Sequence, residues 1–243
     1  MLILVHIILK IFWGGFETCF EKCVSVTFRD QYSFDLFSKY KNVAYAPDVV
    51  LNLDISSYIH LNKTKNVIIS VIDFNRRRDL KKNTLSYEKF IKDCCIEVIN
   101  SGNIPVLMSF CKEEGDEVAI NRIYNELPNN LKPQVKRYFY RGNINETIEY
   151  IASSMYIIAT RFHAMILAIR FNKPFYSVAY NQKIINVLND LNCDAYVLPS
   201  MLDKIKIDDI LDRYSKPIEA NKYIEDARKQ FCMFEQYLRN EIF

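Results

Sequence analysis

The sequence predicts an α/β protein whose main domain is built on a doubly wound parallel sheet. Short apolar runs alternate with longer segments in which apolar residues recur every three or four positions, as strands and amphipathic helices do. The apolar runs lack the polar alternation of a half-exposed strand, which is typical of parallel strands covered on both faces. Residues 154–191 give the clearest case, because they read as strand, helix, strand and helix in succession, a βαβα unit.

Residues 1–61 contain too few elements for an independent doubly wound sheet, so we expect them to be an incomplete piece of a domain. Residues 24–28 alternate like a strand, residues 32–40 read as a short amphipathic helix, and residues 43–45 as a further short strand. The apolar residues 1–13 are shorter than the ~20 residues of a membrane-spanning helix, and no basic segment precedes them as in a signal peptide. We therefore expect a buried strand or helix stub there.

From a polar hinge at residues 53–65 onward the pattern is regular, and we expect a second domain over residues 62–217. Ser86 and Thr160 are suited to cap helices, and Asn172 can end one in the left-handed conformation. The expected strands span residues 66–72, 104–110, 135–140, 155–159, 175–179 and 196–198. The expected helices span residues 86–100, 116–127, 145–153, 161–172, 183–191 and 205–214.

Residues 218–243 form the last predicted unit, a long amphipathic helix over residues 218–242. Its apolar side chains recur at spacings of three and four, which predicts one apolar face. Packing on the sheet is the simpler interpretation of that face. A dimerisation helix is the alternative, but sustained heptads are lacking. The sequence does not predict the oligomeric state.

The composition argues against several classes of protein. The 32 basic and 29 acidic residues nearly cancel, which argues against a protein that coats nucleic acid. The seven cysteines contain no C-x-x-C pair and no ligand cluster of the zinc type. We therefore expect free thiols, a reducing compartment and no bound metal. These features together predict a cytoplasmic protein.

Three basic side chains follow the two strands of the βαβα unit. Arg161 and His163 come directly after residues 155–159, and Lys183 follows residues 175–179. The carboxyl ends of parallel strands are where open α/β sheets bind ligands. Arg161 can hold an anion by two parallel hydrogen bonds beside a helix N-terminus, and His163 can exchange a proton near neutral pH. A satisfied core histidine and a solvated lysine are the ordinary alternatives for His163 and Lys183.

Residues 160–183, T-R-F-H-A-M-I-L-A-I-R-F-N-K-P-F-Y-S-V-A-Y-N-Q-K, resemble the polysaccharide pyruvyl transferase family. Members of that family carry R-[LF]-H-x-x-I-L-A, then Lys-Pro, an aliphatic strand and Y-x-x-K. Two weaker pieces agree in the family's order. F-R-D-Q-Y-S at 28–33 with A-P-D at 46–48 resembles its R-D-x-x-S…P-D segment. S-F-C at 109–111, followed by E-G-D-E at 114–117, resembles its loop after a central strand.

The resemblance runs from about residue 24 to residue 191 and implies a Rossmann-like domain within a two-lobed, glycosyltransferase-B-like architecture. Residues 1–61 are then a remnant of the N-terminal lobe, so the first lobe is incomplete. The resemblance also gives a third alternative for the C-terminal helix, which would cross back towards the first lobe. Family members carry a longer first lobe, with a glycine-rich first strand, loop and helix. A truncated chain is the interpretation we favour, and a remnant adapted to stand alone is the alternative.

The resemblance also implies transfer of a pyruvyl group from phosphoenolpyruvate to a sugar of a surface polysaccharide or its precursor, giving a cyclic ketal. His163 is then the general acid that protonates the methylene carbon, Arg161 the phosphate clamp, and Lys183 the partner of the donor carboxylate. Phosphoenolpyruvate is the donor substrate, and the scheme needs no metal and no cofactor. The acceptor is a sugar or a lipid-linked glycan, which leaves peripheral association with the inner face of the membrane open.

Five further residues are candidates for substrate binding. Asp116 is a helix cap in the simpler interpretation and a ligand of an acceptor hydroxyl in the functional one. Arg76 begins a basic run of three, which is usually a solvated face, with an anionic-glycan or membrane-surface role as the alternative. The others are Thr160, Tyr180 and Asn181, which stand beside Arg161 and Lys183 in the sequence.

One departure from the family leaves other functions open. Ile72 stands where the family commonly has arginine, so Arg76 or Arg77 would have to replace that charge. A nucleotide-sugar glycosyltransferase of similar fold is the rival enzyme, with Asp190 and Asp194 as candidate ribose ligands. An inactive, truncated or degenerate subunit is the third interpretation.

Overall fold

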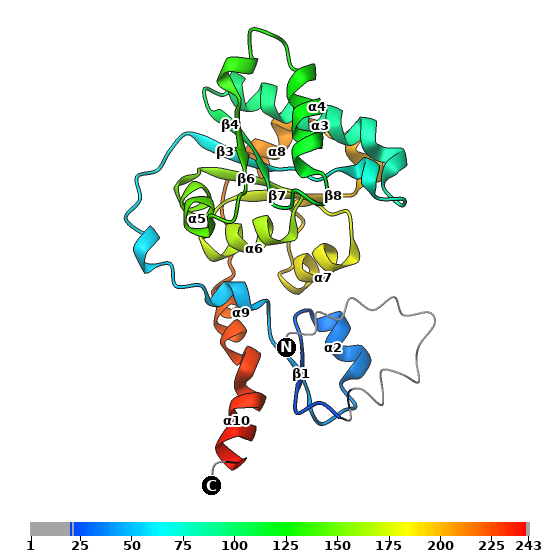
Figure 1. Ribbon diagram of the computed structural model, residues 1–243, viewed down its shortest axis with the longest axis vertical. Coiled ribbons are helices and arrows are strands. Elements are labelled where there is room, and N and C mark those ends of the chain that lie inside the picture. The colour runs from blue at the N-terminus through cyan, green and yellow to red at the C-terminus, as the bar shows by residue number, and fades with distance from the viewer. Residues whose placement is uncertain (1–19, 21, 242–243) are drawn as a thin grey trace.

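The computed structural model describes residue 20 and residues 22–241 (Figure 1). A six-stranded sheet with helices on both faces forms the larger part, and a small two-stranded unit and the C-terminal helix project from one side of it. The expectation for residues 1–13 lies outside the described residues. In the part of the chain that the structure describes, no helix is both long and apolar enough to cross a membrane.

All six strands of the larger sheet run parallel, in the order β5-β4-β3-β6-β7-β8. The strands are β3 (Asn66–Ser70), β4 (Ile104–Ser109), β5 (Lys136–Phe139), β6 (Tyr156–Ala159), β7 (Phe175–Val178) and β8 (Tyr196–Val197). The first three strands add outward from β3 in one direction and the last three from β6 in the other. The predicted α/β class and doubly wound parallel sheet are therefore confirmed, and the strand order switches between β3 and β6.

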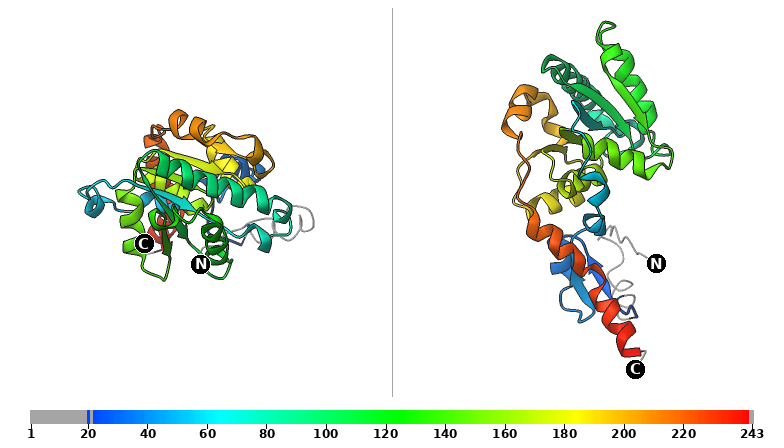
Figure 2. Two further views of the ribbon diagram at one scale, coloured as in Figure 1. Left: turned by 90° about the horizontal axis from the view of Figure 1, so that it is seen from above. Right: turned by 90° about the vertical axis from the view of Figure 1, so that its left-hand side faces the viewer.

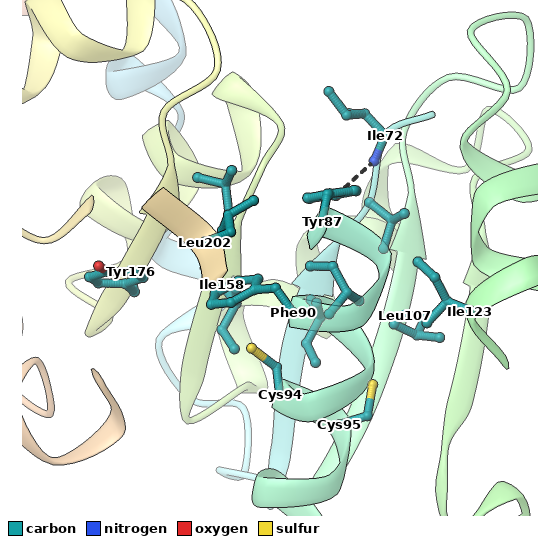
Figure 3. Close-up of a cluster of buried hydrophobic side chains, with 14 of the residues drawn as sticks. Ile72, Tyr87, Phe90, Cys94, Cys95, Leu107, Ile123, Ile158, Tyr176 and Leu202 are labelled. Carbon is teal, nitrogen blue, oxygen red and sulfur yellow. Dashed lines mark hydrogen bonds between the residues drawn. The ribbon is translucent and has the colours of Figure 1, made fainter. Parts of the chain in front are cut away.

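Helices cover both faces of this sheet and enclose two apolar cores. The core on one face lies beneath α3 (Thr84–Asn100), α4 (Asp116–Glu126) and α8 (Ile207–Arg213). The core on the other face lies beneath α5 (Ile144–Ser153), α6 (Phe162–Arg170), α7 (Gln182–Asp190) and α9 (Asn221–Asp226). Figure 3 shows the first core, where Phe90 and the buried thiols of Cys94 and Cys95 point from α3 towards neighbouring apolar side chains.

The smaller unit consists of β1 (Val26–Phe28), α2 (Gln31–Phe37) and β2 (Val43–Tyr45), with the two strands parallel. It has an apolar cluster of its own, in which Phe28 and Phe37 stack. Three polar contacts join it to α7 of the larger domain, and one of them is made by the Tyr45 hydroxyl, which donates to Asp190 at 3.4 Å. The Asn186 amide donates to Asp30 at 2.8 Å, and the backbone N–H of Gln31 donates to Asp190 at 3.0 Å.

Two local expectations were wrong. Ser86 does not cap α3, because the helix already begins at Thr84 and the Ser86 hydroxyl donates to the Asn83 carbonyl at 3.0 Å. The predicted single helix over residues 218–242 is instead divided into α9, a 3₁₀ turn η7 (Ala227–Phe231) and α10 (Cys232–Glu241). Carbonyl groups in η7 accept hydrogen bonds from outside, at Ala227 from Asn52 and at Gln230 from Thr27. The C-terminal segment therefore contacts the smaller unit and lies beside it (Figure 2).

Short 3₁₀ helices occupy several of the connections. They are η1 (Val49–Asn52), η2 (Ser56–Tyr58), η3 (Phe74–Arg76), η4 (Lys81–Asn83), η5 (Lys132–Gln134) and η6 (Pro199–Lys204). The connections after β3 and β6 differ. β3 leads into the 3₁₀ helix η3, whereas β6 leads directly into α6. This places a basic loop and a helix start beside each other at the carboxyl ends of neighbouring strands.

Gly115 fixes the turn between β4 and α4. It is the N-cap of α4 and has φ +86°, in the left-handed region that glycine adopts at low cost. A Cβ atom there would lie 2.7 Å from Arg76 Nε and 2.9 Å from an Asp73 carboxylate oxygen. Asp73 is buried and held by Arg122 at 2.6 Å, so it cannot move aside freely.

We expect Gly115→Ala to lower the free energy of unfolding by about 2–3 kcal/mol, because backbone strain and a steric clash add. Gly102→Ala is the matched control: its φ is +73°, but no atom lies within 4 Å of the added Cβ. That control should lose only about 1 kcal/mol. Urea unfolding of both variants measures the difference, and equal losses would show that the close approach at Gly115 costs nothing.

Candidate functional site

The two strand ends that carry the predicted site residues lie next to each other. β6 and β7 are paired in parallel, with Ala159 opposite Ser177. Arg161 and His163 follow β6, and Lys183 stands in the first turn of α7 after β7. The structure therefore brings these three residues to the same edge of the sheet, where open α/β sheets bind ligands.

Buried hydrogen bonds hold the turn between β6 and α6. The Ser70 hydroxyl accepts from the backbone N–H groups of Thr160 and Arg161, at 2.8 Å and 3.0 Å. The Tyr87 hydroxyl donates to Thr160 Oγ1 at 3.0 Å and accepts from the backbone N–H of Ile72 at 3.2 Å. The expectation that Thr160 caps α6 was wrong, because the N-cap is Arg161. Thr160 itself is fully buried.

Arg161 is anchored by Asp116, a residue 45 positions earlier in the chain. Arg161 Nε donates to Asp116 Oδ2 at 3.1 Å and Nη2 bonds Asp116 Oδ1. Asp116 Oδ2 also accepts from the backbone N–H groups of Phe110 and Cys111, both at 2.9 Å. Asp116 is fully buried and stands with Glu117 in the first turn of α4, as expected, but the N-cap is Gly115, so the expectation of a cap was wrong. The Asp116 carboxylate positions the Arg161 guanidinium.

A second group of charges gathers around Phe162, and we call Arg29, His163, Lys183 and Asp48 with this ring the cationic cluster. Lys183 Nζ lies 3.7 Å and Arg29 Cζ 4.5 Å from the centroid of the Phe162 ring. Arg29 also pairs with Asp48 at 2.8 Å. Arg29 comes from the loop after β1, so the smaller unit contributes to the same place as α6 and α7.

The cationic cluster shifts the titration of two of its members. Desolvation, helped by the charge of Arg29 and opposed by Asp48, lowers the pKa of Lys183 to about 8. Desolvation by the surrounding protein also lowers the pKa of His163, although part of that side chain is exposed to solvent. The charges of Lys183, Arg29 and Arg161 act in the same direction, and Asp48 opposes them. The charge of a bound anion would oppose both shifts.

The remaining predicted residues, Asn181, Tyr180 and Arg76, make different kinds of contact. Asn181 caps α7 by accepting from the backbone N–H of Ile184 at 3.0 Å, so its carbonyl oxygen already has a partner. Arg77 Cζ lies 5.1 Å from the centre of the Tyr180 ring. Arg76 is half exposed and donates to the Glu113 carbonyl at 2.7 Å. Arg77 instead reaches Glu114, which also contacts Arg161.

Sequence reasoning did not include Arg29, Asp48 or Glu114 among the site residues. The quoted R-D-x-x-S…P-D segment was the signal for the first two, since it contains both partners of the Arg29–Asp48 pair. The candidate ribose ligands are engaged elsewhere: Asp190 accepts from Gln31, and Asp194 pairs with Arg213. Among the described residues no group of three His, Cys, Asp or Glu side chains is placed to hold a metal.

Comparison with known proteins adds a family. The sequence profile of polysaccharide pyruvyl transferases matches residues 17–182, which include Arg29, Asp48, Arg161 and His163. No curated protein matches the sequence. A solved structure of ADP-heptose LPS heptosyltransferase II from E. coli is 13% identical, with a TM-score of 0.46 over 72% of this chain and 50% of that chain. A UDP-forming α,α-trehalose-phosphate synthase from Burkholderia vietnamiensis is 10% identical, with a TM-score of 0.48 over 88% and 60%. The chain thus spans half of the first of these structures and three-fifths of the second.

We expect Asp116→Asn to lower the free energy of unfolding by about 3 kcal/mol, because the mostly buried Arg161 loses its buried carboxylate and keeps only the half-exposed Glu114. Glu117→Gln is the matched control in the same helix turn. It removes an ion pair with the exposed Arg141 and should cost less than about 1 kcal/mol. Urea unfolding compares the two, and a loss no larger in Asp116→Asn than in the control would contradict the anchoring role.

Proposed function

The chain belongs to the polysaccharide pyruvyl transferase family, and from this we propose that it transfers a pyruvyl group from phosphoenolpyruvate to a sugar of a surface polysaccharide or its precursor. The product is a cyclic ketal on two sugar hydroxyls. One observation supports the proposal best: the cationic cluster at the carboxyl ends of β6 and β7. The charges of Arg29 and Lys183 there exceed the opposing charge of Asp48, as suits a donor with two anionic groups.

The reaction needs a proton at the methylene carbon of the donor. Protonation there makes the central carbon electrophilic, and a sugar hydroxyl adds to it. A second hydroxyl of the acceptor then replaces the phosphate at this carbon, and the hydroxyl protons balance the proton taken up and the phosphate released. We assign the donated proton to His163, since it lies beside Lys183 and is partly exposed.

Binding of the donor and protonation of His163 are coupled in this scheme. In the free protein desolvation, helped by the neighbouring cations, lowers the pKa of His163 below its ordinary value, which favours the neutral imidazole at pH 7. A donor carboxylate beside Lys183 would cancel part of that positive charge and raise the pKa of His163. The acid is thus charged when the donor is present.

The acceptor and the location are parts of the same proposal. A sugar or a lipid-linked glycan supplies the two hydroxyls, and the protein acts in the cytoplasm, at the inner membrane face where the acceptor is lipid-linked. Ile72 favours the rival interpretation of an inactive chain, because this side chain is buried in the core and supplies no charge. Donor binding and turnover decide between the two.

We expect His163→Ala to lower turnover of phosphoenolpyruvate with glycan precursors by about 10²–10⁴-fold, while donor binding changes far less. His60→Ala is the matched control, because His60 is exposed on the connection that precedes β3, away from both strand ends. Phosphate release measures turnover and calorimetry measures donor binding. A folded parent chain that binds no phosphoenolpyruvate would contradict the proposed function.

The affinity for phosphoenolpyruvate should fall as the pH rises above about 8, because the donor carboxylate needs the charged form of Lys183. Above this pKa the free lysine is neutral and must take up a proton on binding, so affinity falls up to about tenfold per pH unit until the pKa of the complex is reached. The donor phosphate is already ionised in this range. Calorimetry between pH 7 and pH 9.5 measures the slope.

Lys183→Arg should flatten this decline, since arginine stays charged throughout the range. Lys136→Arg, on an exposed position of β5, is the matched control and should keep the decline of the parent. The same slope in Lys183→Arg as in the parent would assign the titration to another group.

A further inference from the structure

The carboxylate of Glu114 stands between two arginines, and we call Arg77, Glu114 and Arg161 the arginine bridge. A single oxygen, Glu114 Oε2, accepts from Arg77 Nη2 and from Arg161 Nη1, both at 2.6 Å. Partial burial alone would raise the pKa of Glu114, but hydrogen bonds and charge from Arg161 and Arg77 outweigh it and lower the pKa. The bridge therefore contains an ionised carboxylate between two guanidinium groups.

The two acids that contact Arg161 are held very differently. Asp116 has no exposed surface and accepts two backbone N–H groups in addition to Arg161. The Glu114 side chain is 46% exposed, and both of its hydrogen bonds are made to the arginines of the bridge. Exchanging Asp116 would leave buried donors without partners, whereas exchanging Glu114 would return a carboxylate to water. Glu114 is the partner that a ligand can replace.

The arginines also come together from separate parts of the fold. Arg77 follows η3 after β3, and Arg161 precedes α6 after β6, so the bridge lies at the point where the strand order switches. Arg77 lies against the Tyr180 ring, which follows β7. Two guanidinium groups directed at one oxygen form an arrangement that suits the several oxygens of a phosphate.

We propose that Glu114 occupies a phosphate site formed by Arg77 and Arg161, and that the phosphate of the donor displaces it. The identity of the donor rests on the proposed function, whereas the phosphate site rests on the bridge itself. Arg161 keeps its two bonds to Asp116 in the exchange, and its Nη1 changes partner from Glu114 to phosphate. Arg77 then supplies the second cation near β3, where Ile72 has none.

Glu114→Gln tests the proposal, with Glu113→Gln as the matched control. Glu113 is exposed, adjacent and of the same charge, but its side chain contacts Cys111 and neither arginine of the bridge. Glu114→Gln should bind inorganic phosphate about tenfold more tightly than the parent, because the ligand no longer competes with a carboxylate. Glu113→Gln should bind like the parent. Adding Arg77→Gln to Glu114→Gln should remove the gain. Calorimetry gives the affinities, and thermal unfolding confirms that each variant is folded.

Unchanged or weaker phosphate binding in Glu114→Gln would overturn the proposal, since Glu114 would then only position Arg161. Equal gains in Glu114→Gln and Glu113→Gln would also overturn it, because the effect would be one of net charge. Phosphoenolpyruvate is titrated into the same variants. If phosphate binding tightens while phosphoenolpyruvate binds to none of them, the phosphate site stands and the proposed donor is wrong. If the parent binds phosphoenolpyruvate and Glu114→Gln gains for neither ligand, the proposed function stands and the phosphate site is wrong.

Discussion

The buried ion pair between Asp116 and Arg161 is the interaction on which the geometry of the site depends. It joins the end of β4 and the start of α4 to the turn between β6 and α6, two parts that are 45 residues apart in the chain. A charge left unpaired at this depth would cost several kcal/mol, so the pair restricts how far the two strand ends can separate. Ser70 and Tyr87 fix the backbone of the same turn by buried hydrogen bonds. The arginine is therefore positioned before any ligand arrives.

The order of the elements could be predicted from the sequence, and so could the grouping of Arg161, His163 and Lys183. Parallel strands place their carboxyl ends at one edge, so residues that follow two paired strands meet there whatever else the chain does. The sequence did not predict the role of Thr160, because its hydroxyl has the chemistry of a helix cap. Its hydroxyl is taken by Tyr87, 73 positions earlier, and burial decides its role. Arg29 was missed for a related reason, because the smaller unit reaches α6 only through tertiary packing.

Arg29 and Lys183 outnumber Asp48, the one carboxylate of the cationic cluster, so the charge of a bound anion would complete the balance. Lys183 and Arg29 lie close to the same ring, and their mutual repulsion together with desolvation weakens the hold of Lys183 on its proton. Asp48 offsets this through its pair with Arg29. An uncompensated group of cations is costly for folding, and proteins retain such groups where ligand binding relieves the repulsion. The titration of His163 responds to the same balance.

Two carboxylates of the chain, those of Asp116 and Glu114, pair with Arg161, and they differ in how deeply they are buried. Asp116 is fully enclosed and bonded to backbone groups, so it belongs to the framework. Glu114 reaches Arg161 from a half-exposed position, and water can solvate it as soon as it leaves. Coulomb attraction to Arg161 favours both acids, so attraction alone does not decide which one a ligand replaces. Desolvation does, because only the exposed acid regains its hydration when it is displaced. The same arginine can therefore be held rigidly on one side and remain available on the other.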